Sequence, residues 1–379
     1  MPVLHFDIES KSALDIKKVG AAVYAEHPTT DAWLLCWAVD DGEVLTWHPG
    51  DPPPDGFIEA ARNPDWTIGA HNSSFERGFW ERILTPRHGF PPVPPIERWR
   101  CTMAQSLACS LPGKLEKVAD ALSLEFRKDA EGHRLMLKMA KPRKPRKGED
   151  PNVLHWNDEP EKLVRLGAYC KRDVEVEREL HHRLPPLSDA EQSLWVLDAA
   201  INARGFHVDG ALLDAASRIA ATVDRAMQDE LARITDGVVT STDQVGALQA
   251  WLAGRGCDVK DMQKDTLKAA LRRRDLDAVA RRAIELRRDA AFDTKVDTML
   301  AHRGADGRIR GTLQYHGAGT GRWAARGVQV QNFTRDPGDV DAKVAAIMAS
   351  DLLVDTRSRS GPSPMRHVAR SARRLATAS

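Results

Sequence analysis

Four carboxylates in this sequence occupy settings where a carboxylate is unfavourable unless a cation faces it. Asp7 and Glu9 lie two residues apart in the run Val3–Ser10, whose apolar residues alternate with them, so both acids share one face of a predicted strand. Glu76 falls in the first turn of a predicted helix, and Asp173 lies on the apolar side of another. Like charges beside a hydrophobic core require neutralisation, which a divalent metal ion supplies.

The ligand types point to a hard cation. Carboxylate oxygens suit Mg²⁺ or Mn²⁺, and the sequence has no cluster of His and Cys that would favour zinc. Two such ions about 3.5–4 Å apart can activate a water and stabilise the leaving oxygen of a phosphodiester. Taken singly, each signal has a plainer explanation, because Asp-x-Glu is common on solvated edge strands and a first-turn glutamate complements the helix dipole. Together the four acids predict a two-metal site for phosphodiester hydrolysis.

The strands and helices that must position these acids follow from apolar periodicity. The runs Ala32–Val39 and Glu43–Trp47 flank an Asp-Gly turn and predict a hairpin beside the first strand. The run Trp66–Ala70 predicts a fourth strand, and Asn72 or Ser73 is expected to cap the helix after it. The third acid thereby lies where a strand ends and a helix starts, the edge at which open α/β sheets place their sites.

A long predicted helix over Glu161–Leu184 closes this region. It places Tyr169 and Asp173 four residues apart on one face. The stretch Cys101–Leu124 is also predicted to be helical, with an interruption at Leu-Pro-Gly. The proline-punctuated basic run Lys141–Lys147 is either a solvated loop or a flexible contact to phosphates, and the sequence leaves both readings open.

The sequence beyond Pro185–Pro186, a predicted domain boundary, is almost entirely helical up to residue 302. Helices are expected over about 188–205, 210–234, 244–252, 264–273 and 276–302, the first of them opened by a Ser188-x-x-Glu191 capping box. The last two helices are rich in arginine. Their arginines either form an ordinary solvent-exposed face or contact the phosphates of a nucleic-acid backbone. The basic, aromatic-free end of the chain predicts an irregular, disordered tail over 337–379.

Composition sets wider bounds. A chain of 379 residues is long enough for two or three domains, and its formal net charge of +1 lets basic patches coexist with an acidic metal site. The chain has five cysteines, an odd number, and none of them lie in the short paired spacings of a zinc site. We therefore expect buried, reduced thiols in a reducing cytoplasm. No apolar run is long enough for a membrane span and no signal segment is visible, so we expect a cytoplasmic protein that does not enter a membrane.

The first half of the chain carries three spaced motifs that resemble those of the 3′-5′ exonucleases with a ribonuclease H-like fold, in the branch that contains a tyrosine. The motifs are Asp7-x-Glu9, Asn72-x-x-x-Glu76 and Tyr169-x-x-x-Asp173. The region from Ser188 onward, with Thr320-Gly321-Arg322 and Gln329-Val330-Gln331-Asn332, is similar to the thumb and early palm of family A DNA polymerases, the DNA polymerase I type. The resemblance covers about residues 1 to 336.

The resemblance implies a role for each acid. Asp7 is expected to touch both metal ions, Glu9 and Asp173 to bind the ion that activates water, and Glu76 to bind the second ion. Tyr169 is expected to orient the attacking water together with Glu9. The second motif usually ends in Asp, and the glutamate here is one methylene longer.

The resemblance also implies contacts to DNA. Asn72 and Phe75 are expected to bind the substrate strand. Arg322, Gln329 and Asn332 match residues that hold the primer-template duplex near the primer end.

The implied architecture is an α/β ribonuclease H-like exonuclease domain over 1–185, a mixed sheet with flanking helices. A mainly α thumb-like region over 186–305 and the start of a polymerase palm over 306–336 are expected to follow. The palm aspartates and the fingers helix of the family are not visible after Asp336. We therefore expect a C-terminally truncated or frame-shifted polymerase-like chain, with the irregular tail over 337–379 in place of the palm.

The resulting expectation is a metal-dependent 3′-5′ exonuclease of proofreading type, which acts on single-stranded DNA 3′ ends and has no polymerase activity of its own. Two alternatives stay open. The three motifs do not separate DNA from RNA, so a ribonuclease of the same superfamily fits them too. A non-catalytic DNA-binding fragment, whose acids bind no metal, is the other.

Overall fold

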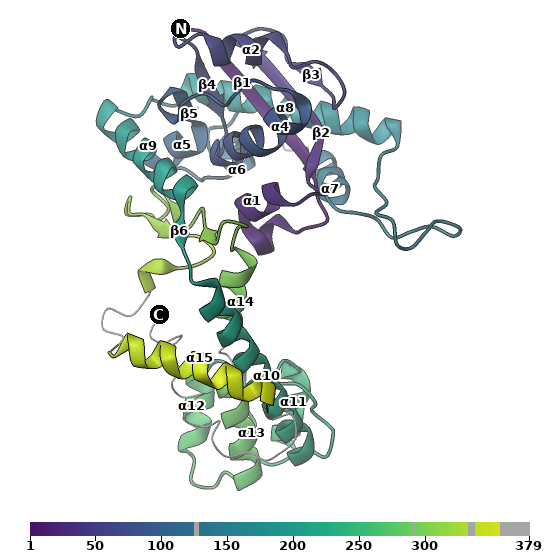
Figure 1. Cartoon of the computed structure of the whole chain (residues 1–379), viewed down its shortest axis with the longest axis vertical. Helices are drawn as coiled ribbons and strands as arrows, with labels where there is room; N and C mark the ends of the chain where they lie inside the picture. The colour runs from purple at the N-terminus through teal and green to yellow at the C-terminus, as the bar shows by residue number, and fades with distance from the viewer. Residues whose placement is uncertain (125–128, 291–292, 333–337, 357–379) are drawn as a thin grey trace. The chain divides into compact units, whose positions relative to one another are not determined.

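The computed structural model describes residues 1–124, 129–290, 293–332 and 338–356 (Figure 1). The chain divides into two compact units. The first comprises Met1–His207 and Ala301–Gln329, and the second comprises Val208–Leu300 with the described residues from Val330 onward. The division therefore does not follow the boundary expected at Pro185–Pro186, because α9 (Asp189–Arg204) buries Trp195 in the core of the first unit.

The first unit is built around a five-stranded mixed sheet in the order β3-β2-β1-β4-β5. Its strands are β1 (Val3–Lys11), β2 (Asp31–Val39), β3 (Leu45–Trp47), β4 (Thr67–Ala70) and β5 (Trp99–Cys101). The central strand β1 pairs antiparallel with β2 and parallel with β4, which pairs parallel with β5. The antiparallel pairing of β2 with β3 confirms the predicted hairpin. The mixed sheet with helices around it confirms the coarse fold class.

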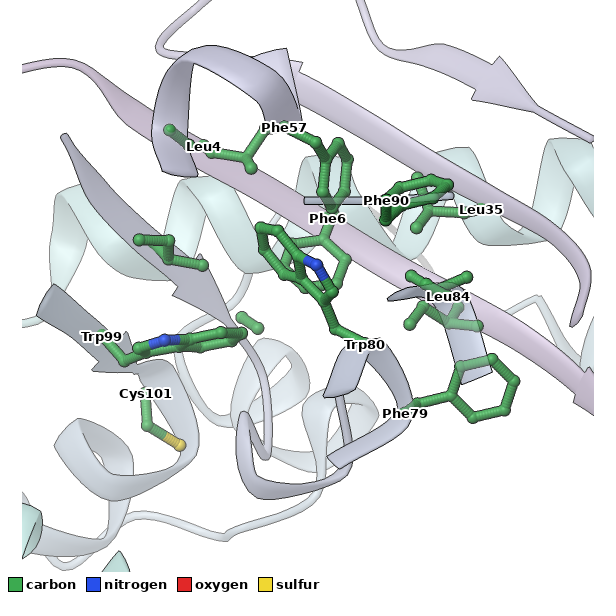
Figure 2. Close-up of a cluster of buried hydrophobic side chains, with 14 of the residues drawn as sticks. Leu4, Phe6, Leu35, Phe57, Phe79, Trp80, Leu84, Phe90, Trp99 and Cys101 are labelled. Atoms are coloured by element: carbon green, nitrogen blue, oxygen red, sulfur yellow. The ribbon is translucent and has the colours of Figure 1, made fainter. Parts of the chain in front are cut away.

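One face of β1 lies in an aromatic core. Leu4, Phe6 and Ile8 alternate along the strand and are all buried. The ring of Phe6 packs edge-on against those of Phe57 and Trp80, with centroids 5.1 and 5.9 Å away. Figure 2 shows Phe6, Phe57 and Trp80 gathered on one side of β1. Burial of such large rings fixes the register of β1, since a slip by one residue would turn the aromatic face to the opposite side.

The other face of β1 is covered by α8 (Pro160–Arg183), a 24-residue helix. Proline in its first turn suits a helix start, where the missing N–H is not needed. Leu166, Cys170 and Val174 recur at helical spacing and are fully buried against β2 residues such as Leu34 and Cys36. The alternation in β1 therefore points its odd-numbered residues at this helix.

Shorter elements complete the first unit. They are α1 (Ile16–Glu26), α2 (Asp55–Arg62), α3 (Ser74–Phe79), the π-helix η1 (Trp80–Leu84), α4 (Thr85–His88), η2 (Ile96–Arg98), α5 (Thr102–Ala108), α6 (Leu115–Ala121) and α7 (Ala130–Met139), with the two-stranded pairs β6 (Phe206–His207) with β7 (Arg308–Ile309) and β8 (Leu313–Gln314) with β9 (Ala324–Ala325). The predicted interruption near Leu-Pro-Gly separates α5 from α6. Four of the five cysteines are buried as expected, whereas Cys109, at the end of α5, is exposed.

The second unit is helical, as predicted. It contains α10 (Gly210–Ile234), α11 (Val245–Ala253), α12 (Lys264–Arg272), α13 (Ala278–Asp289), most of α14 (Asp293–Ala301), η3 (Val330–Asn332) and α15 (Val340–Thr356). The single helix expected over 276–302 is instead α13 and α14. Asp277 caps the start of α13 through bonds to two backbone N–H groups, and α13 ends at Asp289.

The irregular tail expected over 337–379 is wrong for residues 340–356, which form α15. Ile347 of this helix is buried against Ala215 and Ile219 of α10. The expectation extended the basic composition of the last residues to a stretch that is rich in Ala, Val, Ile and Leu. Residues 357–379 lie outside the described part of the chain. Within the described residues, no helix combines the length and apolar character that crossing a membrane requires.

Candidate metal centre

The first and last predicted motifs meet where β1 packs on α8. A carboxylate oxygen of Asp7, one of Glu9 and the Sγ of Cys170 all lie within 4.8 Å of one another. The Cys170 thiol donates to Oδ2 of Asp7 at 3.5 Å. Burial raises the pKa of this thiol, so it remains protonated and serves as a hydrogen-bond donor. Hence Asp7 and Glu9 are the potential metal ligands of this trio.

Asp173 follows Cys170 by three residues, slightly less than one helical turn, on the same helix. Tyr169, four residues before Asp173, hydrogen-bonds to its carboxylate. Burial, followed by the charge of Asp7, raises the pKa of Asp173 to about 8. Burial and the neighbouring charge of Asp173 likewise raise the pKa of Tyr169, so its hydroxyl is a donor at neutral pH.

Glu76 reaches the site from the start of α3. Asn72 takes a left-handed conformation, with φ of 63°, where the chain leaves β4, and asparagine tolerates this better than most residues. The N-cap of α3 is Ser73, but no side-chain capping bond forms, contrary to the expected cap. Glu76 is only 4% exposed, and its Oε2 has no hydrogen-bond partner in the described part of the chain. A buried carboxylate oxygen without a partner is a position that a cation would satisfy.

All seven residues predicted for the nuclease site line one cavity of about 970 Å³ in the first unit. They are Asp7, Glu9, Asn72, Phe75, Glu76, Tyr169 and Asp173. The fold thereby brings together side chains that are up to 166 positions apart in the sequence, which local periodicity could not guarantee.

Burial and mutual repulsion both raise the pKa values of the acids in the cavity. Burial is the largest cause in each case and raises the pKa of Asp7 to about 6 and that of Glu9 well above its usual range. The charges of Asp7 and Asp173 raise the pKa of Glu9 further. Burial and the charge of Asp7 raise the pKa of Glu76 as well. Such mutual repulsion marks a site whose ionised form needs a cation, and an all-oxygen donor set fits a hard divalent one.

A buried hydrogen bond that the sequence reasoning missed ties β1 to α8 beside this site. Nδ1 of His5 lies 2.6 Å from Oε2 of Glu177, and the ring of His181 packs edge-on against His5. The signal was present in the spacing, because His5 precedes Asp7 by two residues on the same strand face and Glu177 follows Asp173 by four on the same helix face. The spacing of His5 and Glu177 alone did not show that they pair with each other, because residues with a purely structural role have the same spacing.

The chain is similar in sequence to the DNA polymerase of Bacillus phage SP02, with 32% identity over 345 residues, or 89% of this chain and 52% of that protein. The chain is therefore a relative of a phage DNA polymerase over about half of that protein's length. Its fold is similar to that of the POL domain of Pol1 from M. smegmatis in complex with DNA primer-template and dNTP, with a TM-score of 0.50 and 14% identity over 91% of this chain and 54% of that one. The chain thus spans about half the length of each. No family model matches it.

The residues expected to hold duplex DNA in this polymerase-related chain are spread over both units. Arg322 is exposed in the turn between β8 and β9, and Gln329 is exposed shortly after β9. Asn332 ends η3, in the second unit. Arg322 and Gln329 do not line the carboxylate cavity, whereas Gln314 and Arg326, from the same segment as Arg322, do.

The basic run 141–147 is largely neutralised by acids of the first unit. Arg143 makes two hydrogen bonds of 2.6 Å to the carboxylate of Glu149. Arg146 bonds Glu159 at 2.7 Å, and Lys141, on the cavity wall, bonds the partly exposed Asp15 at 2.8 Å. These pairs favour the surface-loop reading of the run over the flexible phosphate contact.

Arginines of the second unit also have internal partners. Arg282 forms a bidentate ion pair with Glu230 of α10, in which Nε and Nη2 donate to the two carboxylate oxygens at 2.7 Å each. Arg281 donates to the backbone carbonyl oxygens of Leu271, near the end of α12, and of Arg273, which follows it. Arg273 also pairs with Asp275 at 2.6 Å. These side chains stabilise the packing of the helices, so the arginine content alone does not define a nucleic-acid surface.

Proposed function

We propose that this polymerase-related chain is a metal-dependent 3′-5′ exonuclease of proofreading type that hydrolyses phosphodiesters at DNA 3′ ends. The observation that carries the proposal is the single cavity in which Asp7, Glu9, Glu76 and Asp173 meet. The mixed sheet, with an antiparallel second strand and parallel later strands, is consistent with a ribonuclease H-like exonuclease domain. Under this proposal the second unit is the thumb-like part, and residues from 306 begin a palm.

The four acids would hold two Mg²⁺ or Mn²⁺ ions, which supply a nucleophilic hydroxide and stabilise the leaving oxygen. Asp7, at the centre of the acidic cluster, is the candidate ligand of both ions. Glu9 and Asp173 flank it from β1 and α8, and Glu76 approaches from α3. The partnerless oxygen of Glu76 supports its place in the donor set, although the family usually has the shorter Asp.

Tyr169 is the candidate for orienting the attacking water. Its hydroxyl stays protonated and hydrogen-bonds to Asp173, so it is held next to the acids rather than free in solvent. Glu9, buried on the neighbouring strand, is the second partner for this water. Positioning of this kind lowers the barrier by fixing the direction of attack.

Asn72 and Phe75 are the candidate contacts to the terminal nucleotide. Both line the cavity and are only partly exposed, one at the β4–α3 turn and the other on α3. An aromatic ring can stack on any base, and an amide can bond to a base or sugar oxygen, so the pair fits a strand end without sequence preference.

The proposal is tested with single-stranded DNA labelled at its 5′ end, so that removal of 3′ nucleotides gives a ladder. Asp7→Asn and Asp173→Asn should each lower the Mg²⁺-dependent rate by at least about 100-fold, since either change removes a ligand charge at the reacting centre. Glu43→Gln, which changes an exposed acid outside the cavity, is the matched control and should retain the wild-type rate. Full activity in both aspartate variants would refute the proposal.

A matched RNA oligonucleotide decides between DNA and RNA as substrate. Faster hydrolysis of RNA would favour the ribonuclease alternative. Strand binding without hydrolysis of either polymer would favour a DNA-binding module without catalysis.

A further inference from the structure

The segment that follows β7 returns to the wall of the carboxylate cavity. Its strands β8 and β9 pair with Gln314 opposite Ala324, and the backbone N–H of Arg326 donates to Thr312 O at 2.9 Å. The N–H of Leu313 donates to Oδ1 of Asn202 on α9 at 2.9 Å, which fixes the segment within the first unit. As a result, two polar side chains, Gln314 and Arg326, line the same cavity as the four acids.

The guanidinium of Arg326 is held in place by neutral groups. Its Nε donates to Oε1 of Gln314 at 2.8 Å, and its Nη2 lies 3.9 Å from the Sδ of Met103 on α5. No carboxylate of the described residues forms an ion pair with it. Arg310, sixteen residues earlier, differs in this respect because it forms two hydrogen bonds to Asp306. Arg326 is therefore an oriented cation on the cavity wall whose N–H groups are in no ion pair with a carboxylate of the described part of the chain.

The chemistry of the cavity indicates what this cation would meet. A nucleic-acid strand that enters carries one negative charge per linkage, and the acids oppose every phosphate that the metal ions do not hold. A guanidinium matches the planar oxygen pair of a phosphate and can bind it through two hydrogen bonds. Arg326 is exposed, so a strand can reach its guanidinium from solvent, and desolvation lowers its pKa although the nearby charge of Asp198 acts in the opposite direction.

We propose that Arg326, oriented by Gln314, binds a non-scissile phosphate of the single strand whose 3′ end occupies the carboxylate cavity. The ligand is a backbone phosphodiester, and the contact is independent of base identity. This inference rests on the proposed exonuclease function and assigns a substrate subsite within it. It also gives the polymerase-like segment after residue 306 a part in the hydrolytic site of the first unit.

The test combines substitutions of Arg326 with DNA substrates in which one phosphate has lost its charge. A series of single-stranded oligonucleotides carries one uncharged methylphosphonate linkage at successive positions from the 3′ end. The KM and kcat for Mg²⁺-dependent hydrolysis are measured for the wild type, Arg326→Gln and Arg326→Lys. Arg62→Gln removes the same charge from an exposed position on α2 that does not line the cavity, and it is the control.

We expect Arg326→Gln to raise KM about tenfold with kcat changed less than about twofold, the pattern of a lost uniform binding contact. A methylphosphonate at one position should raise the KM of the wild type, whereas the same linkage should cause no further rise in the KM of Arg326→Gln. Arg326→Lys should restore part of the affinity. A KM and a position profile in Arg326→Gln equal to those of Arg62→Gln would overturn the inference, since a merely structural role would not couple to one phosphate.

Strand binding without metal separates this inference from the proposed function. Fluorescence anisotropy in EDTA reports the Kd of the same oligonucleotides whether or not hydrolysis occurs. Arg326→Gln should weaken binding and reduce the slope of log K against log salt by about 0.7, the value for one phosphate contact on a single strand. If the wild type shows no hydrolysis, the exonuclease proposal fails, whereas an unchanged Kd and salt slope in Arg326→Gln overturn the phosphate contact alone.

Discussion

His5 and Glu177 form a buried pair that joins the central strand to the longest helix of the first unit. Nδ1 of His5 lies 2.6 Å from Oε2 of Glu177, and their side chains are 1% and 3% exposed. Asp7 follows His5 by two residues and Asp173 precedes Glu177 by four, so the pair fixes the two elements that carry these acids. Its integrity should therefore decide how closely the acids approach each other.

Removal of one partner of this pair should destabilise the first unit. Glu177→Ala leaves the buried imidazole without its partner, which costs about 2 kcal/mol of unfolding free energy. Glu177→Gln keeps a hydrogen-bonding group of the same length and should lose less. Urea unfolding followed by tryptophan fluorescence measures both, and an alanine variant as stable as the wild type would show that the pair contributes nothing.

Two glycines provide a test of how tightly the same pair is packed. A Cβ at Gly69, which lies opposite His5 in the sheet, would come within 2.8 Å of His5 Nδ1 and 3.4 Å of Glu177 Oε1. Gly69→Ala should therefore displace His5, lower the melting temperature by several degrees and reduce hydrolysis.

Gly78, within α3, is the matched control. A Cβ there meets nothing within 4 Å, so Gly78→Ala should raise stability by about 0.5–1 kcal/mol through helix propensity. Equal melting temperatures for the two alanine variants would contradict the close packing at Gly69.

His71 should make stability depend on pH. Its Nδ1 lies 3.0 Å from Thr102 Oγ1 and its Nε2 lies 3.0 Å from Gly113 O, and burial lowers its pKa to about 4. The unfolded chain, with a histidine pKa near 6.5, takes up the proton first as the pH falls. The contribution of His71 is therefore complete above about pH 6.5 and is lost progressively towards pH 4, by up to about 3 kcal/mol.

The comparison of wild type with His71→Gln isolates this effect. The raised pKa values of Asp7 and Asp173 act in the opposite direction, because the folded chain holds those protons more tightly and gains stability as the pH falls. The difference in unfolding free energy between the two proteins should shrink from pH 7.5 to pH 4.5. A difference that does not change with pH would rule out a neutral, buried His71.

A divalent cation should stabilise the protein through the acids of the cavity. At about 100 times its Kd, Mn²⁺ should add about 2.7 kcal/mol to the unfolding free energy, since it binds only the folded chain. Asp7→Asn should lose most of this gain, and Glu76→Asp, the shorter acid, should retain part of it. Thermal unfolding in EDTA and in Mn²⁺ measures the effect, and an equal shift in the wild type and in Asp7→Asn would contradict a site at Asp7.

The parts of the site that the sequence predicted depend on local periodicity. Period two places Asp7 and Glu9 on one face of β1, and a spacing of four places Tyr169 and Asp173 on one face of α8. The same rules found the hairpin of β2 with β3. The sequence therefore predicted the face on which each of these side chains lies, because that face depends only on the residue's own strand or helix.

The features that were missed depend on packing between distant segments. The contact of Cys170 with Asp7 and the pairing of His5 with Glu177 exist only once α8 lies on β1. Arg326 reaches the cavity through β8 and β9, about 150 residues beyond the last motif. The helix α15 was missed for a different reason, because the composition of the last residues was applied to its apolar stretch.

The central claim is that Asp7, Glu9, Glu76 and Asp173 hold the same pair of ions. The most direct measurement is an anomalous difference map from crystals of this protein grown with Mn²⁺. The account predicts two peaks about 3.5–4 Å apart within coordination distance of these four carboxylates. A map with Mn²⁺ elsewhere on the protein and no peak in this cavity would contradict it.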